Sequence, residues 1–261
     1  MLKISNISVE IDSKKIVDNI SMSFNLGQTY FLLGKNGSGK SSLAFTIAGH
    51  PKYKISSGEI TVEGENIIQL SPDKRNKLGI FLSFQNVPEI KGIRLSEYLR
   101  TIYNASLQTK NPDTKPVSPF LFKRFIGQFL TELSIPENFL DRDLNVGFSG
   151  GEKRKIELLQ IKLLNPKYII LDEIDSGLDI DAFKIVASNL AKIKNENNTL
   201  IFITHNFNLL DYIEVDGVFV LEKGELIDSG DQKLVEKIKK FGYCSYCNEH
   251  EDNCDLETKC T

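Results

Sequence analysis

The chain has little cysteine, no tryptophan and no long apolar run. Its four cysteines all lie after residue 243, so residues 1–243 do not depend on disulfide bonds for stability. No apolar stretch approaches the roughly 18 residues that a membrane-spanning helix needs, and we therefore expect no direct insertion into a membrane. The N-terminus lacks the composition of a signal or transit peptide, which predicts a cytoplasmic protein, or a stromal one if a plastid-type organelle encodes it.

A charge excess of one sign is also missing. The formal net charge is −3 at pH 7 over 261 residues, whereas nucleic-acid-binding proteins usually carry a basic excess. We therefore expect no nucleic-acid partner. Hydrophobic residues make up 41% of the chain and charged residues 26%, which is ordinary for a soluble globular protein.

Hydrophobic periodicity predicts an α/β fold with a doubly wound core. Half-buried strands are expected where apolar and polar residues alternate, and fully buried strands where apolar residues run together. In about residues 86–164 the apolar residues follow helical spacing instead, and the polar segment Ala105–Ser118 is predicted to be a surface loop. We predict one domain over residues 1–243, with a helical subdomain inserted at about 86–164. The predicted strands are Leu2–Ile11, Ile20–Phe24, Tyr30–Leu33, Ser57–Val62, Gly79–Phe84, Tyr168–Leu171, Leu200–Thr204, Gly217–Leu221 and Glu225–Ser229, and the predicted helices are Lys40–Ala48, Leu95–Tyr103, Phe120–Leu133, Ile180–Lys194 and Leu234–Phe241.

A glycine-rich segment follows the buried strand Tyr30–Leu33 and opens the helix Lys40–Ala48. It matches the phosphate-binding pattern G-x-x-x-x-G-K-[ST] in full, between a strand and a helix as that loop requires. Its backbone amides would wrap the phosphates of ATP, Lys40 would reach the β- and γ-phosphates, and Ser41 would ligate Mg²⁺. A plain glycine turn is the alternative. The predicted cofactor-binding residues here are Gly34, Lys35, Asn36, Gly37, Ser38, Gly39, Lys40, Ser41 and Ser42.

Two carboxylates, Asp172 and Glu173, end the buried strand Tyr168–Leu171. A strand buried in such a sheet delivers them to its carboxyl edge, where ligands of these folds bind. Asp172 would hold Mg²⁺ through water, and Glu173 would be the general base that activates the attacking water. The alternative is an acidic N-cap for the next helix.

The segment Gly147–Lys155 carries a third motif, Ser149-Gly150-Gly151, at the predicted start of another helix. The two glycines let the backbone approach a ligand closely, and Ser149 offers a hydroxyl. The N–H groups of the opening helix would point at anionic oxygens. Ser149 followed three residues later by Glu152 is also a capping box, so an ordinary serine-capped helix is the alternative.

These motifs, in this order, resemble those of ATP-binding-cassette (ABC) ATPases over most of the chain. In that family the signature, here Gly147–Lys155, closes over ATP held by another subunit, which implies an ATP-dependent homodimer. The resemblance implies that His205 contacts the γ-phosphate and that Gln85 senses Mg²⁺ and the attacking water. Ser176–Asp179 matches the loop that crosses to the other subunit. The implied fold has a RecA-like P-loop core, an N-terminal antiparallel β-subdomain and an inserted helical subdomain.

One feature of the family is missing. Many ABC ATPases place an aromatic residue upstream of the phosphate loop to stack on adenine, and Ile11–Ile16 has none. We therefore expect adenine to pack on aliphatic groups such as Ile16.

Within the family, several passages resemble the SufC-type ATPases of iron–sulfur cluster assembly. Phe84–Gly92 is similar to their glutamine-loop passage, and Phe148 and Glu152 stand where transporters usually have Leu and Gln. Leu171–Asp181 is the most specific match, because transporter ATPases have different residues after the catalytic Glu. The resemblance implies an ATPase that drives conformational change of a SufB/SufD-type scaffold. The alternative is the energising subunit of a membrane ABC transporter, whose ATP site would be similar.

Either partner would dock beside the glutamine loop, so we predict a docking region over Gln85–Tyr98. Its apolar residues have two interpretations. They are either partly exposed anchors for the partner or packing residues of the helical subdomain. The residues in question are Val87, Ile90, Ile93 and Leu95.

The cysteines belong to an acidic tail over residues 244–261. Zinc or iron binding is one interpretation, because zinc takes four nitrogen or sulfur ligands. The later spacings fit no standard zinc knuckle, so we favour a flexible tail with reduced thiols. The candidate ligands are Cys244, Cys247, His250, Cys254 and Cys260.

Overall fold

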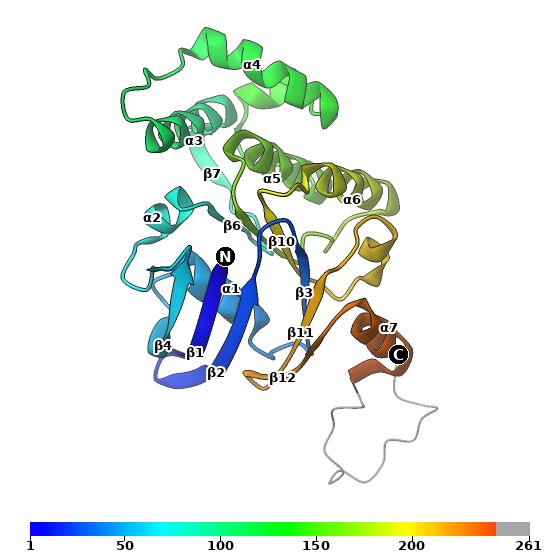
Figure 1. Ribbon diagram of the computed structural model, residues 1–261. Helices are drawn as coiled ribbons and strands as arrows, with labels where there is room; N and C mark the ends of the chain where they lie inside the picture. Colours follow the sequence, from blue (N-terminus) through cyan, green and yellow to red (C-terminus); the bar gives the residue numbers. More distant parts are fainter. Residues whose placement is uncertain (244–261) are drawn as a thin grey trace.

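The computed structural model describes residues 1–243, and its core is a six-stranded, mostly parallel sheet (Figure 1). The strand order is β12-β11-β3-β10-β9-β6, and only β11 and β12 are antiparallel neighbours. Every residue of β3, β9 and β10 is buried, as their continuous apolar sequences predict. These strands are β3 (Thr29–Leu33), β6 (Ile80–Ser83), β9 (Tyr168–Asp172), β10 (Thr199–Ile203), β11 (Gly217–Glu222) and β12 (Glu225–Gly230).

A second sheet is antiparallel and has the order β2-β1-β4-β5. One hydrophobic cluster joins this sheet to helix α1 (Lys40–Ala48) and to one face of the core sheet, through side chains such as Ile4, Leu43 and Ile170. The N-terminal antiparallel β-subdomain implied by the family resemblance is therefore present. Its strands are β1 (Leu2–Ile11), β2 (Lys14–Phe24), β4 (Lys54–Val62) and β5 (Glu65–Asn66).

Helices cover the opposite face of the core sheet. A second hydrophobic cluster joins Phe31 and Phe202 of the sheet to Ile156 of α5 and Val186 of α6, and it continues into α3 and α4. Figure 1 shows α3 and α4 at the top of the molecule, on the side away from the antiparallel sheet. Besides α1, the helices of residues 1–243 are α2 (Pro72–Lys77), α3 (Leu95–Lys110), α4 (Pro119–Glu132), α5 (Gly150–Leu164), α6 (Ile180–Ile193) and α7 (Gln232–Phe241), with short 3-10 helices η1 (Glu137–Asp141) and η2 (Phe207–Asp211). Of these, α2 contacts α1 rather than the helices of the opposite face.

The region between residues 86 and 164 differs from the prediction in two places. The loop expected over Ala105–Ser118 begins only after Lys110, because α3 continues to that residue. The buried Asn104 of α3 binds the backbone of Val117 and fixes the shorter loop, with its Oδ1 accepting from the Val117 N–H at 2.8 Å. A two-stranded ribbon of β7 (Ile90–Arg94) and β8 (Asp143–Leu144) also lies within this expected helical region.

The four apolar residues of the predicted docking region separate in the structure. Leu95 is fully buried and packs within the helical cluster, so for this residue the packing interpretation holds. Ile90 and Ile93 remain 38% and 41% exposed, and Val87 is half-buried. No helix in residues 1–243 is both long enough and apolar enough to cross a bilayer. The tail residues from Cys244 to Cys260 lie outside the described part of the chain.

Candidate active site

The predicted site residues other than those of the signature come together at one edge of the core sheet. β3 leads into Gly34, β9 ends in Asp172, and Glu173 follows it. Gln85 and His205 each follow a neighbouring strand, β6 or β10, by two residues. Because β6, β9, β10 and β3 are parallel neighbours, their carboxyl ends meet at this edge, where ligands of open α/β sheets bind.

The glycine-rich loop holds its lysine at its centre. The Lys40 ammonium is buried and donates hydrogen bonds to the carbonyl oxygens of Gly34 and Lys35 at 2.7 and 2.9 Å. Burial lowers the pKa of Lys40, while the charges of Glu173 and Asp172 oppose that shift. Gly39 caps α1 without a side-chain hydrogen bond, and no acidic residue lies in the first turn. The start of α1 therefore presents its N–H groups to an anion.

Gly34 cannot be replaced at the start of this loop. Its φ is +144°, and a Cβ atom there would lie 2.1 Å from the carbonyl oxygen of Leu221. Its N–H donates to the phenol oxygen of Tyr243 at 3.1 Å. The last described residue of the chain is thus bound to the loop that the motif predicts for phosphate, and no sequence pattern pointed to Tyr243.

Asp172 and Ser41 form an oxygen-rich pair beside the loop. The Ser41 hydroxyl donates to Oδ1 of Asp172 at 3.1 Å, and Oδ2 of Asp172 is buried without a hydrogen-bond partner in residues 1–243. Burial raises the pKa of Asp172, and the hydrogen bond from Ser41 opposes that shift. Hydroxyl and carboxylate oxygens are the ligands that Mg²⁺ prefers, so this pair fits the predicted metal role.

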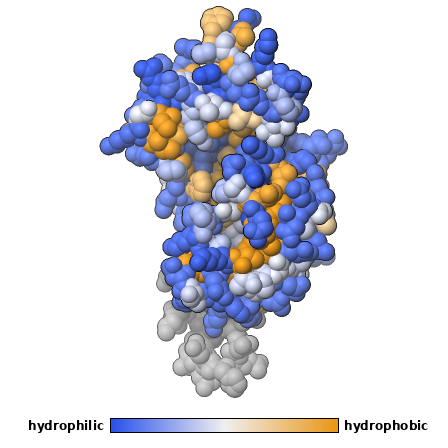
Figure 2. Space-filling model, turned by 90° about the vertical axis from the view of Figure 1, so that its left-hand side faces the viewer, coloured by the Kyte–Doolittle hydropathy of each residue, from blue (hydrophilic) through white to orange (hydrophobic). Residues whose placement is uncertain are grey.

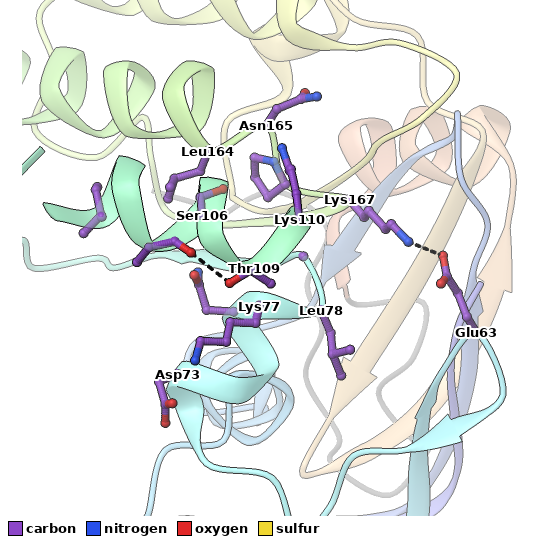
Figure 3. Close-up of a pocket in the computed structure, with 15 residues that line it drawn as sticks. Glu63, Asp73, Lys77, Leu78, Ser106, Thr109, Lys110, Leu164, Asn165 and Lys167 are labelled. Carbon is purple, nitrogen blue, oxygen red and sulfur yellow. Dashed lines mark hydrogen bonds and ion pairs between the residues drawn. The ribbon is translucent and has the colours of Figure 1, made fainter. Parts of the chain in front are cut away.

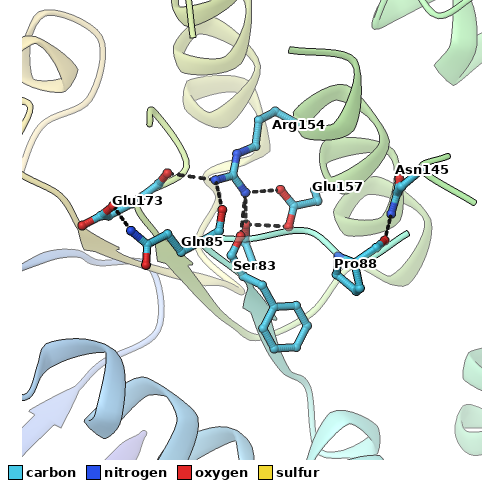
Figure 4. Close-up of polar contacts among 8 residues, drawn as sticks. Ser83, Gln85, Pro88, Asn145, Arg154, Glu157 and Glu173 are labelled. Atoms are coloured by element: carbon cyan, nitrogen blue, oxygen red, sulfur yellow. Dashed lines mark hydrogen bonds and ion pairs between the residues drawn. The ribbon is translucent and has the colours of Figure 1, made fainter. Parts of the chain in front are cut away.

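Glu173 and Gln85 touch directly, since Nε2 of Gln85 donates to Oε2 of Glu173 (Figure 4). Glu173 has a φ of +49°, a left-handed conformation that non-glycine residues rarely adopt outside special sites. Two backbone bonds hold it there, from the Glu173 N–H to Ile203 O at 2.8 Å and from the Ser176 N–H to Glu173 O at 3.0 Å. The helix that follows is capped by Asp179, so the N-cap alternative for Asp172 and Glu173 is wrong.

His205 follows β10 and reaches the surface at the same edge. Desolvation lowers its pKa, the charge of Lys40 lowers it further, and the charge of Glu173 opposes both. The imidazole is therefore held neutral to a lower pH than an unperturbed histidine.

Arg154 is a site residue that the sequence reasoning missed. It is 3% exposed, and it bonds to the carboxylate of Glu157 at 2.6 Å. Its guanidinium also donates to the carbonyl oxygens of Phe84, Gln85 and Glu173, at 2.8, 3.1 and 2.9 Å (Figure 4). One buried cation thus fixes the backbone at both Gln85 and Glu173. The only indication in the sequence was the spacing of Arg154 and Glu157, which allows an ion pair on one face of a helix. In most helices such a pair lies on a face exposed to solvent.

The signature lies at the start of α5, beside the segment that leads into α6. Ser149 caps α5 in a capping box with Glu152, as the alternative interpretation of the motif required. Ser149 and Gly150 are nevertheless exposed, so the motif remains accessible at the surface although Ser149 caps the helix. A Cβ atom on Gly150 would meet Gly177 O at 3.4 Å and one on Gly151 would meet Ala182 Cβ at 3.2 Å, both from the segment that starts α6.

Comparisons with known proteins give the same family. The family model described as ABC transporter matches residues 17–176. A protein of Antithamnion sp. named "Probable ATP-dependent transporter ycf16" is 43% identical over 249 residues, which cover 95% of this chain and 98% of that protein. The "Iron-sulfur cluster assembly protein SufC" of Plasmodium falciparum is 38% identical over 243 residues, which cover 93% of this chain and 70% of that protein.

Solved structures share the fold. The cassette MJ1267 of an ABC transporter, in its ADP conformation, aligns with a TM-score of 0.71 at 25% identity, over 93% of this chain and 94% of that one. The dimeric cassette MJ0796 in a post-hydrolysis state with ADP and Pi also aligns with a TM-score of 0.71, at 20% identity, over 88% of this chain and 98% of that one. The chain therefore belongs to the ABC ATPase family and, like its members, is an ATP-hydrolysing enzyme.

Proposed function

We propose that this ATPase works in iron–sulfur cluster assembly and uses ATP hydrolysis to change the conformation of a SufB/SufD-type scaffold. The observation that carries the proposal is the likeness to a SufC protein over 93% of the chain. The passage Leu171–Asp181, with its SufC-like residues after the catalytic Glu, supports the same assignment. The cytoplasmic or stromal location expected from the sequence stays a prediction that cell fractionation tests.

At the site, Glu173 is the proposed general base. Its carboxylate would take the proton of the water that attacks the γ-phosphate, and the hydrogen bond from Gln85 would orient it. Lys40 and the amides of the loop would hold the β- and γ-phosphates, and the neutral His205 would donate a hydrogen bond to the γ-phosphate. Ser41, Asp172 and Gln85 would hold Mg²⁺, which neutralises charge on the phosphate oxygens.

The proposed site is shared between two chains. Ser149, Gly150 and Gly151 lie on the surface or near it, and the atoms closest to the two glycines belong to the segment that starts α6. We infer that this signature completes the ATP site of a second copy, as the family resemblance implies. The exposed N-terminus of α5 would then face the γ-phosphate of the ATP bound by that copy.

A groove beside Gln85 is the proposed docking site for the scaffold. It is a cavity of about 340 Å³ between the core sheet and the helical part. Figure 2 shows the hollowed face of the molecule, with apolar surface between polar side chains. Five residues of the predicted docking region or its border line the groove: Phe84, Val87, Pro88, Ile90 and Tyr98.

The groove continues toward a second cavity of about 470 Å³ (Figure 3). The two cavities share Asn76, Ile102 and Leu164, and the second one is lined by polar side chains of α2 and α3. The proposed docking site is the first groove, which residues of the predicted docking region line.

The alternative function is the energising subunit of a membrane transporter, as the name of the Antithamnion relative suggests for that protein. A permease would use the same groove, so the ATP site does not distinguish the two functions. The identity of the partner distinguishes them.

The experiment compares two matched substitutions against a purified SufB/SufD-type scaffold. Ile90→Asp introduces a charge into the groove at a side chain that is 38% exposed, and Ile227→Asp makes the same change on β12 at 37% exposure. We expect Ile90→Asp to weaken scaffold binding at least about tenfold, because a charge would be buried at the contact. Ile227→Asp should bind as the wild type does, and both should bind ATP. Equal scaffold affinity in the two variants would contradict docking at this groove.

A further inference from the structure

The segment that lines the groove is bonded along its length to the segment that leads into the signature. β7 pairs with β8 through Ile90 with Leu144 and Arg94 with Asp143. The Leu95 N–H donates to Arg142 O at 2.9 Å. The docking region and the residues before Ser149 therefore form one hydrogen-bonded unit.

Asn145 is a buried polar residue of this unit that lines the groove. It is 2% exposed, and its Nδ2 donates to the carbonyl oxygen of Pro88 at 2.9 Å (Figure 4). Its φ is +60°, and its own carbonyl accepts from the Phe148 N–H at 3.4 Å, which closes the turn that enters the signature. Its Oδ1 is buried without a partner among the described residues. Pro88 also lines the groove, so an occupant of the groove would contact the residue whose carbonyl oxygen holds the Asn145 amide.

A second bond joins the same two segments beyond the signature serine. Nζ of Lys153, in the first turns of α5, lies 2.7 Å from Oε1 of Glu89. The hydrogen bond and the charge of Lys153 lower the pKa of Glu89, and the backbone of Gly147 contributes less. Ser149 is thus flanked on both sides by residues that are bonded to the groove segment.

We propose that Asn145 is a positioning residue that transmits occupancy of the groove to the signature, with the Glu89–Lys153 ion pair as the second link. The inference rests on the proposed function in that a scaffold supplies the occupant. An occupant that packs on Pro88 fixes the carbonyl oxygen to which Asn145 Nδ2 donates, and the Asn145 amide fixes the turn before Ser149. Docking would then order the signature for the ATP of the second copy, because coupling between sites travels through such bonded networks.

The first arm of the test needs no partner. Asn145→Gly keeps the left-handed backbone conformation and removes the amide. Asn165→Gly is the matched control, because Asn165 also has a positive φ, of +48°, but caps the far end of α5 beside the second cavity (Figure 3). We expect amide hydrogen exchange over residues 146–152 to rise at least about tenfold in Asn145→Gly and to stay unchanged in the control. Unchanged exchange in Asn145→Gly would overturn the link.

Lys153→Met tests the second link in case Asn145→Gly does not fold. It should raise exchange in the same residues, and the double change Glu89→Lys with Lys153→Glu should restore protection by re-forming the ion pair with reversed charges. Exchange that stays at the wild-type level in Lys153→Met, or a double change no better protected than the singles, would count against the proposal.

The second arm measures ATP turnover with and without the scaffold. We expect the ratio of the two rates to fall toward one in Asn145→Gly, while scaffold affinity changes by less than about threefold, and the ratio in Asn165→Gly to match the wild type. A ratio that is unchanged in Asn145→Gly overturns the proposal. A wild type that neither binds nor responds to the scaffold contradicts the proposed function instead, and the exchange arm still decides whether Asn145 ties the groove to the signature.

Discussion

Replacing Arg154 by methionine is expected to lower both the thermal stability and the turnover of the enzyme, for reasons that can be separated. The side chains of Arg154 and Glu157 are each 4% exposed and lie 2.6 Å apart. Burial raises the pKa of Glu157, and the adjacent Arg154 opposes that shift. Without the guanidinium, the Glu157 carboxylate loses its paired charge and keeps the hydrogen bond from the Ser83 hydroxyl. The carbonyl oxygens of Phe84, Gln85 and Glu173 lose the hydrogen bonds that Arg154 donates.

The size of the stability loss follows from the burial of the pair. Removing one partner of a buried ion pair costs about 3–5 kcal/mol, because the other charge is left unpaired. For a domain of about 150–250 residues, each kcal/mol lowers Tm by about 2–4 °C, so we expect a drop of about 6–20 °C. Turnover should also fall, by about tenfold to 100-fold, because the backbone at Gln85 and Glu173 is no longer held in place.

Arg75→Met is the matched control. Arg75 is also 3% exposed, and it also donates to backbone carbonyls, but to those of Thr46, Ile47, Ile68 and Leu70, which lie outside the proposed site. Both variants should melt earlier by circular dichroism, and only Arg154→Met should lose turnover when assayed well below both melting temperatures.

The double variant Arg154→Met with Glu157→Leu separates the two effects further. It removes the Glu157 carboxylate that Arg154→Met leaves unpaired, so Tm should recover while turnover stays low. The reasoning is refuted if Arg154→Met melts within about 2 °C of the wild type, or if it turns over ATP at the wild-type rate.

Three further predictions concern the ATP site. Glu173→Gln should keep ATP binding and lose at least about 100-fold in turnover, because the proton acceptor is gone while the phosphate loop remains; turnover within about threefold of wild type would exclude Glu173 as the base. Tyr243→Phe removes the acceptor for the Gly34 N–H, so it should raise KM for ATP about fivefold with little change in kcat. Truncation after Tyr243 should leave both constants unchanged. An unaltered KM in Tyr243→Phe would refute the role of that hydrogen bond. The pKa of His205 is lowered in the folded protein, so the unfolded chain binds a proton at this residue more readily than the folded chain does. As the pH drops from about 7 to about 5, the Tm of the wild type should therefore fall relative to that of His205→Gln. The same dependence of Tm on pH in both proteins would contradict this.

The residues at the carboxyl edge of the core sheet could be predicted because they belong to local sequence patterns. Gly34–Ser41 has fixed spacing between a buried strand and a helix, and Asp172 and Glu173 end an apolar run. Parallel strands bring such strand ends together whatever the rest of the fold does. The parallel strands alone therefore predict that these two motifs, Gln85 and His205 lie close together.

The features that were missed depend on tertiary contacts. All five residues of β7 are exposed, so Ile90–Arg94 shows no burial periodicity, and its partner β8 lies far along the chain. The polar end of α3 remains helical because Tyr103 stacks on Phe125 and Asn104 binds the loop. The burial of Arg154 depends on two strand ends that converge on it, which no spacing within α5 predicts.

Affinity purification of the native protein with mass spectrometry tests the central claim most directly. If the chain is the ATPase of iron–sulfur cluster assembly, the wild type should recover SufB/SufD-type scaffold proteins and no integral membrane subunit. The Ile90→Asp variant should lose the scaffold proteins. Its depletion should lower the activity of iron–sulfur enzymes broadly. Recovery of a permease, together with the loss of uptake of one solute, would contradict the proposal and assign the chain to a transporter.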